Sequence, residues 1–156
     1  MHKQRHGSKN MAVSATLHCL TGCAIGEILG LVIGTALDLS NAATIALAIV
    51  LAFIFGYALS LMSLVKGGLA VGAALSIALA ADTLSITTME IVDNLVMVVI
   101  PGAMNAGLAN PLFWLALTVA LIAAFFAALP VNAYLIKRGK GHALAHAAHN
   151  HEDHSQ

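Results

Sequence analysis

Charged side chains are scarce in this sequence. They make up 9% of its 156 residues, against roughly 25% in an average soluble protein. Hydrophobic residues make up 60%. A soluble fold of this size could not bury so much apolar surface, so the composition predicts that lipid is the solvent for most of the chain.

Several other features are also missing, and each absence excludes a class of function. No run of Lys and Arg suggests a nucleic-acid partner, and the net charge is zero with His neutral. No phosphate loop, nucleotide motif or nucleophile–base–orienter set is present, so an enzyme of the soluble type is unsupported. The only two cysteines, Cys19 and Cys23, are too few for a disulfide framework.

Long apolar runs predict four transmembrane helices, at about residues 14–37, 43–65, 69–100 and 111–136. The spans must be helical, because an open strand edge in lipid would leave its backbone unpaired. The third run is longer than the ~20 residues that a bilayer needs, so this span is tilted, projecting or broken near its polar centre. We therefore expect an all-α membrane protein with a tail at 1–13, a four-helix domain at 14–137 and a His-rich tail at 138–156.

The basic residues indicate how these spans are oriented. All of them fall in the two tails or in the loop between the second and third spans, which lie on one side of a four-span topology. The positive-inside rule places that side in the cytoplasm. We expect a multi-pass protein of the inner (plasma) membrane with both termini cytoplasmic, on the evidence of Lys3, Arg5, Lys9, Lys66, Lys137, Arg138 and Lys140.

The first span carries glycines at a spacing of four residues. Small residues at this spacing lie on one helix face and allow another helix to approach closely. We expect the face to pack against another helix and, because four spans make a thin bundle, to support a homo-oligomer. The glycines are Gly22, Gly26, Gly30 and Gly34.

The same span carries potential metal ligands. Cys19, Cys23 and Glu27 lie on one stripe at 100° per residue, and His18 flanks it. Thiolate and imidazole ligands suit copper(I) or zinc, although a buried cysteine can also act as a small hydrophobe. A carboxylate in hydrocarbon is strongly disfavoured, so Glu27 is expected to be neutral or bound to a cation.

The third span carries acidic and thioether side chains on less than half of its circumference. No Lys or Arg in any span can pair with the acids, so they must hold protons, bind cations or face water. For Glu90 and Asp93 the alternative is a solvated position in the outer aqueous zone, whereas Asp82 lies within hydrocarbon. The set comprises Asp82, Met89, Glu90, Asp93 and Met97.

The C-terminal tail contains His142, His146 and His149 at spacings that share one helical face. His-rich tracts commonly bind zinc, copper, nickel or cobalt. The alternative is a polar, disordered tail without a bound metal.

Several of these motifs together resemble a family of small bacterial multi-span membrane proteins that is catalogued as a domain of unknown function. The resemblance covers about residues 14–142. It implies that the polar residues belong to one signature, and it implies no activity. The motifs are His18-Cys19-x-x-Gly22-Cys23-x-x-Gly26-Glu27, Met89-Glu90-x-x-Asp93-Asn94-x-x-Met97, Pro101-Gly102-Ala103-Met104, Pro111-Leu-Phe-Trp114, Pro130-Val-Asn132 and Arg138-Gly-Lys-Gly-His142.

These patterns favour a membrane protein, not an enzyme, that handles or transports a copper- or zinc-class cation through intramembrane Cys, His and carboxylate ligands. Two alternatives stay open. One is a structural or assembly subunit of a membrane complex that docks through the glycine face. The other is a membrane redox or haem protein. Bound metal distinguishes the first interpretation from the assembly subunit, and visible colour would indicate haem.

The orientation can be tested with reporter fusions. An alkaline phosphatase domain fused after Gln156 should be inactive, because it would remain in the reducing cytoplasm, whereas the same domain inserted after Leu39 should be active. Phosphatase activity from the C-terminal fusion together with an inactive insertion would show the opposite orientation.

Overall fold

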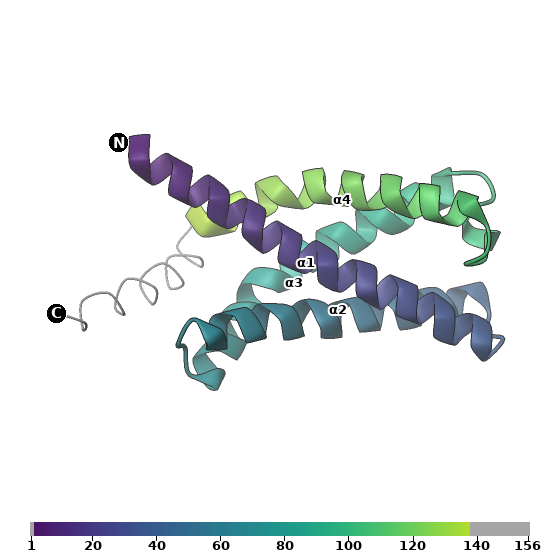
Figure 1. Ribbon diagram of the computed structural model, residues 1–156, viewed down its shortest axis with the longest axis horizontal. Helices are drawn as coiled ribbons and strands as arrows, with labels where there is room; N and C mark the ends of the chain where they lie inside the picture. The colour runs from purple at the N-terminus through teal and green to yellow at the C-terminus, as the bar shows by residue number, and fades with distance from the viewer. Residues whose placement is uncertain (1, 138–156) are drawn as a thin grey trace.

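The computed structural model describes residues 2–137, with side chains from Asn10 onward. The tail histidines His142, His146 and His149 lie outside the described residues. Within them the chain is helical, with no strand (Figure 1). The elements are α1 (His2–Ala36), α2 (Asn41–Lys66), α3 (Val71–Val99), the short 3-10 helix η1 (Ala103–Asn105) and α4 (Pro111–Lys137).

The four long helices are long and apolar enough to cross a membrane, over Asn10–Ala36, Asn41–Lys66, Val71–Val99 and Pro111–Lys137. Large apolar side chains are exposed on the outside of the bundle, which is favourable in lipid and unfavourable in water. The predicted all-α, four-span protein is therefore confirmed to this extent. The exposed side chains include Ile54, Ile91, Leu115 and Phe126.

Two helices differ from the prediction. α1 begins at His2, so most of the expected N-terminal tail is helical, in keeping with the lack of proline there. α3 is continuous over 29 residues, so the alternative of a broken third span is wrong. The hydroxyls near its centre bond to the carbonyl one turn earlier, as Thr87 does to Thr83 at 2.6 Å, and leave the helix's own hydrogen bonds intact.

Short capped turns connect the helices. Asp38 adopts a left-handed φ of 52° after α1, and the Ser40 hydroxyl then accepts a hydrogen bond from the Ala43 N–H at 3.3 Å to cap α2. Gly102 has a φ of 81° after α3. The Trp114 indole donates to the Leu108 carbonyl at 2.8 Å and holds the α3–α4 connection against α4.

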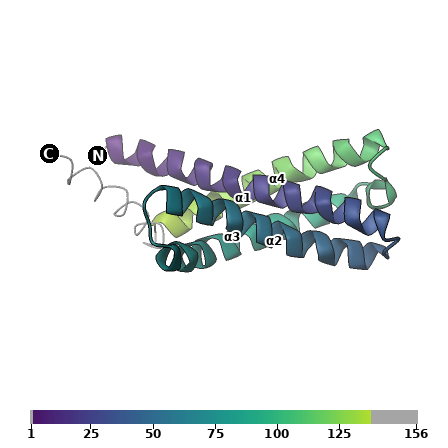
Figure 2. The same ribbon diagram turned by 60° about the horizontal axis from the view of Figure 1, so that its bottom comes forward.

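The helices form a crossed bundle rather than a parallel one. α1 crosses in front of α3, with α2 along one side and α4 along the other, and Figure 2 shows the same arrangement from a second direction. The start of α1, the α2–α3 turn and the end of α4 lie at one end, here called the terminal end. The α1–α2 turn and the α3–α4 connection lie at the opposite end, here called the loop end.

The glycine stripe of α1 packs against α2 of the same chain. A Cβ placed on Gly22 would lie 2.5 Å from the Cα of Gly56, and a Cβ on Gly30 would lie 2.5 Å from the Cα of Ala48. Gly26 meets Ala52 in the same way. The predicted close approach to another helix is confirmed. α2 of the same chain fills this face, and the expected homo-oligomer stays a prediction.

Small residues and two hydrogen bonds position the other helices. Asn132 of α4 donates to the Thr16 hydroxyl of α1 at 2.8 Å, in a buried position. Tyr57 of α2 and Thr83 of α3 share a hydrogen bond of 2.7 Å. α4 presents a buried alanine stripe to the bundle interior, consisting of Ala116, Ala120, Ala124 and Ala128.

The α1–α2 contact predicts the effect of adding a single methyl group. Gly26→Ala should lower the unfolding free energy by at least ~1–3 kcal/mol, because the new Cβ overlaps the Ala52 backbone. The matched control is Gly72→Ala, where a Cβ would meet nothing within 4 Å and the stability should be unchanged or higher. Thermal melting in detergent compares the two variants, and equal midpoints would contradict the packing.

Candidate functional site

Polar side chains of α1 and α3 face each other inside the bundle. Since the two helices run in the same direction, residues further along α1 meet residues further along α3. The layer nearest the terminal end joins Cys19 to Asp82, with the Sγ donating to the carboxylate Oδ1 at 3.7 Å. Ser60 of α2 and Ser85 of α3 lie beside this pair.

The next layers toward the loop end contain only acids and one thiol. Cys23 lies beside Glu90, and Glu27 lies beside Asp93, with Glu90 as a further electrostatic neighbour. The thiols of both cysteines are free. Cys19, Cys23 and Glu27 of α1 therefore each have an acidic group of α3 as a neighbour.

Most of the oxygens in these layers have no hydrogen-bond partner. A buried polar atom without a partner costs about 1–3 kcal/mol, and more when it is charged. No Lys or Arg is present between residues 10 and 65 or between 67 and 136 to offset the charge. The arrangement requires protons, cations or water at these atoms: both Oε of Glu27 and of Glu90, Asp82 Oδ2, Asp93 Oδ1 and Ser85 Oγ.

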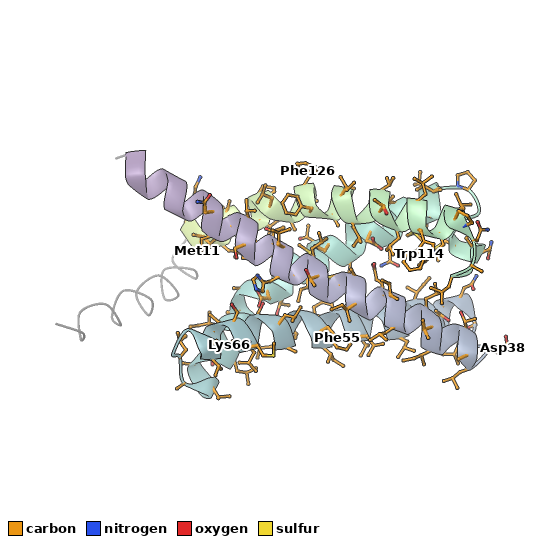
Figure 3. All side chains as sticks on the ribbon, in the orientation of Figure 1. Met11, Asp38, Phe55, Lys66, Trp114 and Phe126 are labelled. Atoms are coloured by element: carbon orange, nitrogen blue, oxygen red, sulfur yellow. The ribbon has the colours of Figure 1, made fainter. Side chains whose placement is uncertain are left out.

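A cavity of about 290 Å³ connects this region to the loop end. Its wall includes the exposed residues Asp38 and Asn41 at the α1–α2 turn and the buried Glu90 and Asp93 at its inner end. Figure 3 shows Asp38 at the loop end of the bundle. The polar and sulfur-containing side chains of the wall are Glu27, Thr35, Asp38, Asn41, Thr44, Glu90, Asp93, Asn94, Met97 and Met104.

Only some of the residues predicted from the sequence line the cavity. Glu27, Glu90, Asp93 and Met97 line it. Glu90 and Asp93 are each only 5% exposed, so the alternative of two surface acids in the outer aqueous zone is wrong.

The remaining predicted residues lie deeper or outside. Cys19, Cys23 and Met89 belong to a tightly packed core cluster and do not line the cavity. Asp82 is buried beside Cys19. His18 is exposed and pairs its Nδ1 with the Ser14 carbonyl at 2.8 Å, so it flanks the thiol stripe as the helical angle predicts.

The donor atoms have the right chemistry for a metal ion but form pairs instead of one shell. Among the side chains that the structure describes, no three from His, Cys, Asp and Glu converge closely enough to hold a metal ion. A bare ion shared by several of these residues would therefore require side-chain movement. The predicted metal site stays a prediction.

Sequence reasoning missed several residues of this region. Met104 and Asn94 line the cavity, and Ser60 reaches the Cys19–Asp82 pair from α2. Asn94 adjoins Asp93 in the chain and Ser60 interrupts an apolar span, so both carried a weak signal. Met104 stood in a family-like motif, but only the position of η1 brings it to the cavity wall.

Comparison with known families gives one match. The model of a family described as "Domain of unknown function (DUF4396)" matches residues 8–141. No curated protein and no solved structure matches the chain. The resemblance to a family of unknown function is confirmed, whereas the proposed His-Cys signature and the bacterial origin stay predictions.

The unpartnered oxygens predict that this site lowers the unfolding free energy of the bundle. Glu90→Leu should raise the unfolding free energy by about 1–3 kcal/mol, because two buried oxygens without partners are removed. Asn132→Leu, at an equally buried position, should lower it by a similar amount, because Thr16 loses its hydrogen bond. Melting in metal-free detergent measures both variants. A loss of stability in Glu90→Leu as large as that in Asn132→Leu would mean that Glu90 has a structural role.

Proposed function

Because the chain belongs to the DUF4396 family of unknown function, we propose a function from its own residues: it handles or transports a copper- or zinc-class cation across the bilayer. The cation is the cargo, and the Cys and carboxylate side chains between α1 and α3 are its ligands. Soft thiolates select copper(I) or zinc over magnesium and calcium.

One observation carries this proposal. Buried carboxylates with unpartnered oxygens lie next to two free thiols, in the spans Asn10–Ala36 and Val71–Val99, which contain no Lys or Arg. A purely structural core would contain apolar side chains at these positions, because they would be more stable there. A cation supplies the positive charge that no Lys or Arg supplies in these two spans.

The pairing of thiols with acids gives each thiol a proton acceptor. A thiol binds a metal as the thiolate, so its S–H bond must break when the S–metal bond forms. Cys19 donates to Asp82 at 3.7 Å, and that carboxylate can take the proton. Glu90 lies beside Cys23 and can act in the same way. Metal binding is then coupled to proton movement along α3.

The positive-inside rule supports a direction for the path. Lys66 at the end of α2 and Lys137 at the end of α4 both lie at the terminal end, and Figure 3 labels Lys66 there. We propose that this end faces the cytoplasm of an inner-membrane protein and that the cavity opens to the outside. His142, His146 and His149 would then hold metal on the cytoplasmic side.

The alternatives make different predictions about the purified protein. An assembly subunit would contain no stoichiometric metal. A haem protein would absorb visible light, and a thiol redox enzyme would cycle Cys19 and Cys23 between the reduced and disulfide forms. None of the contacts between α1 and α3 favours these alternatives over cation binding.

The decisive test is metal binding by the full-length chain with its five tail histidines, from His142 to His154, replaced by alanine. Cys19→Ser/Cys23→Ser should weaken copper(I) or zinc binding by more than about tenfold, since even outer-shell partners of a metal site contribute 10–100-fold. Met62→Leu, which removes an exposed sulfur from α2, should change nothing. Equal metal content with and without the cysteines, in variants that melt alike, would refute the proposal.

A further inference from the structure

We propose that the cavity at the loop end is a separate outer site, which binds a divalent cation together with part of its water shell. Its ligands are the oxygens of Glu27, Glu90, Asp93 and Asn94. The role of this site as the first stage of a path to the thiols rests on the proposed function, whereas the binding itself does not.

The inner wall of the cavity presents oxygens that have no other partner. Glu90 is 5% exposed, lines the cavity, and has two unpartnered oxygens. Asp93 and Glu27 add further unpartnered carboxylate oxygens to the same wall. The Asn94 amide is oriented by its hydrogen bond to the Glu90 carbonyl at 2.8 Å. Carboxylate, amide and water oxygens are the ligands that magnesium and manganese prefer.

The spacing of these acids favours a hydrated ion over a bare one. No three acidic, His or Cys side chains in the described part of the chain converge on one point, so they cannot replace a whole water shell. The cavity of about 290 Å³ exceeds the roughly 180 Å³ that six waters occupy at about 30 Å³ each. Magnesium-type ions keep several waters and are commonly held by one or two carboxylates.

The inner thiols belong to a packed core cluster and do not line this cavity. Ile86 and Met89 are at most 1% exposed and pack with Cys19 and Cys23. A Cβ on Gly56 would lie 2.7 Å from the Ile86 Cδ1, so α2 also packs tightly against this cluster. A cation that passes from the acids to the thiols must therefore lose its water, and only an ion with high affinity for sulfur gains enough in return.

The probe for the outer site is Mn²⁺, added to the full-length protein in nanodiscs of zwitterionic lipid. Electron paramagnetic resonance titration should show saturable binding, and proton relaxation should show exchangeable water on the bound ion. Glu90→Gln and Asp93→Asn should each weaken binding by about tenfold or more. Thr87→Val is the control, because this polar residue also lies on α3 but does not line the cavity.

A measurement on the unmodified chain locates the ion if a variant fails to fold. Bound Mn²⁺ should broaden the methyl resonances of Met97 and Met104, which line the cavity, and spare those of Met11 and Met62, which do not. Equal broadening at all four methyls, binding that survives both acid substitutions, or a bound ion without exchangeable water would each overturn the outer site.

The outcome separates this inference from the proposed function. Cys19→Ser/Cys23→Ser should retain Mn²⁺ binding, whatever happens to copper(I) or zinc. Mn²⁺ binding without any cysteine-dependent metal would leave the outer site standing and remove the transition-metal function. Cysteine-dependent binding of zinc or copper without a Mn²⁺ site would support the transition-metal function and remove the outer site.

Discussion

Helices in a bilayer gain little hydrophobic free energy from each other, because lipid tails are as apolar as their side chains. Their association depends on close packing instead, and in this chain the closest packing joins α1 to α2. Gly22 meets Gly56, and Gly26 meets Ala52, with no room for one more methyl group. This contact fixes the rotation of α1 about its own axis. The stripe of Cys19, Cys23 and Glu27 is thereby turned toward α3 instead of toward lipid.

The polar interior has the features of a site that trades stability for function. Asn132 and Thr16 show how the same bundle treats a structural polar pair: both side chains are buried and joined by a hydrogen bond of 2.8 Å. Glu90 is as deeply buried as Asn132 and has no such partner. Polar groups that a fold buries without satisfying them are expected where a ligand or proton completes them.

The polar groups of the interior also change in kind from the loop end inward, from oxygens to thiols. Carboxylate and amide oxygens on a cavity wall lie toward the loop end, and the thiols lie deeper in a packed cluster. The proposed path would attract cations by charge at its mouth and discriminate between them where water must be lost. Removal of the water shell is costly for hard cations, and thiolates compensate for it best with soft ones.

The sequence by itself determined the number, position and helical nature of the spans, because bilayer thickness and backbone hydrogen bonding act on each segment separately. It also identified Cys19, Cys23, Glu27 and Asp82 as polar residues that need a proton, a cation or a polar partner within a span. Only the tertiary structure decided that α2 covers the glycines, that α3 is unbroken, and that Glu90 and Asp93 are buried on a cavity wall. These features depend on how each helix rotates against its neighbours, and that rotation is set by contacts between residues far apart in the chain.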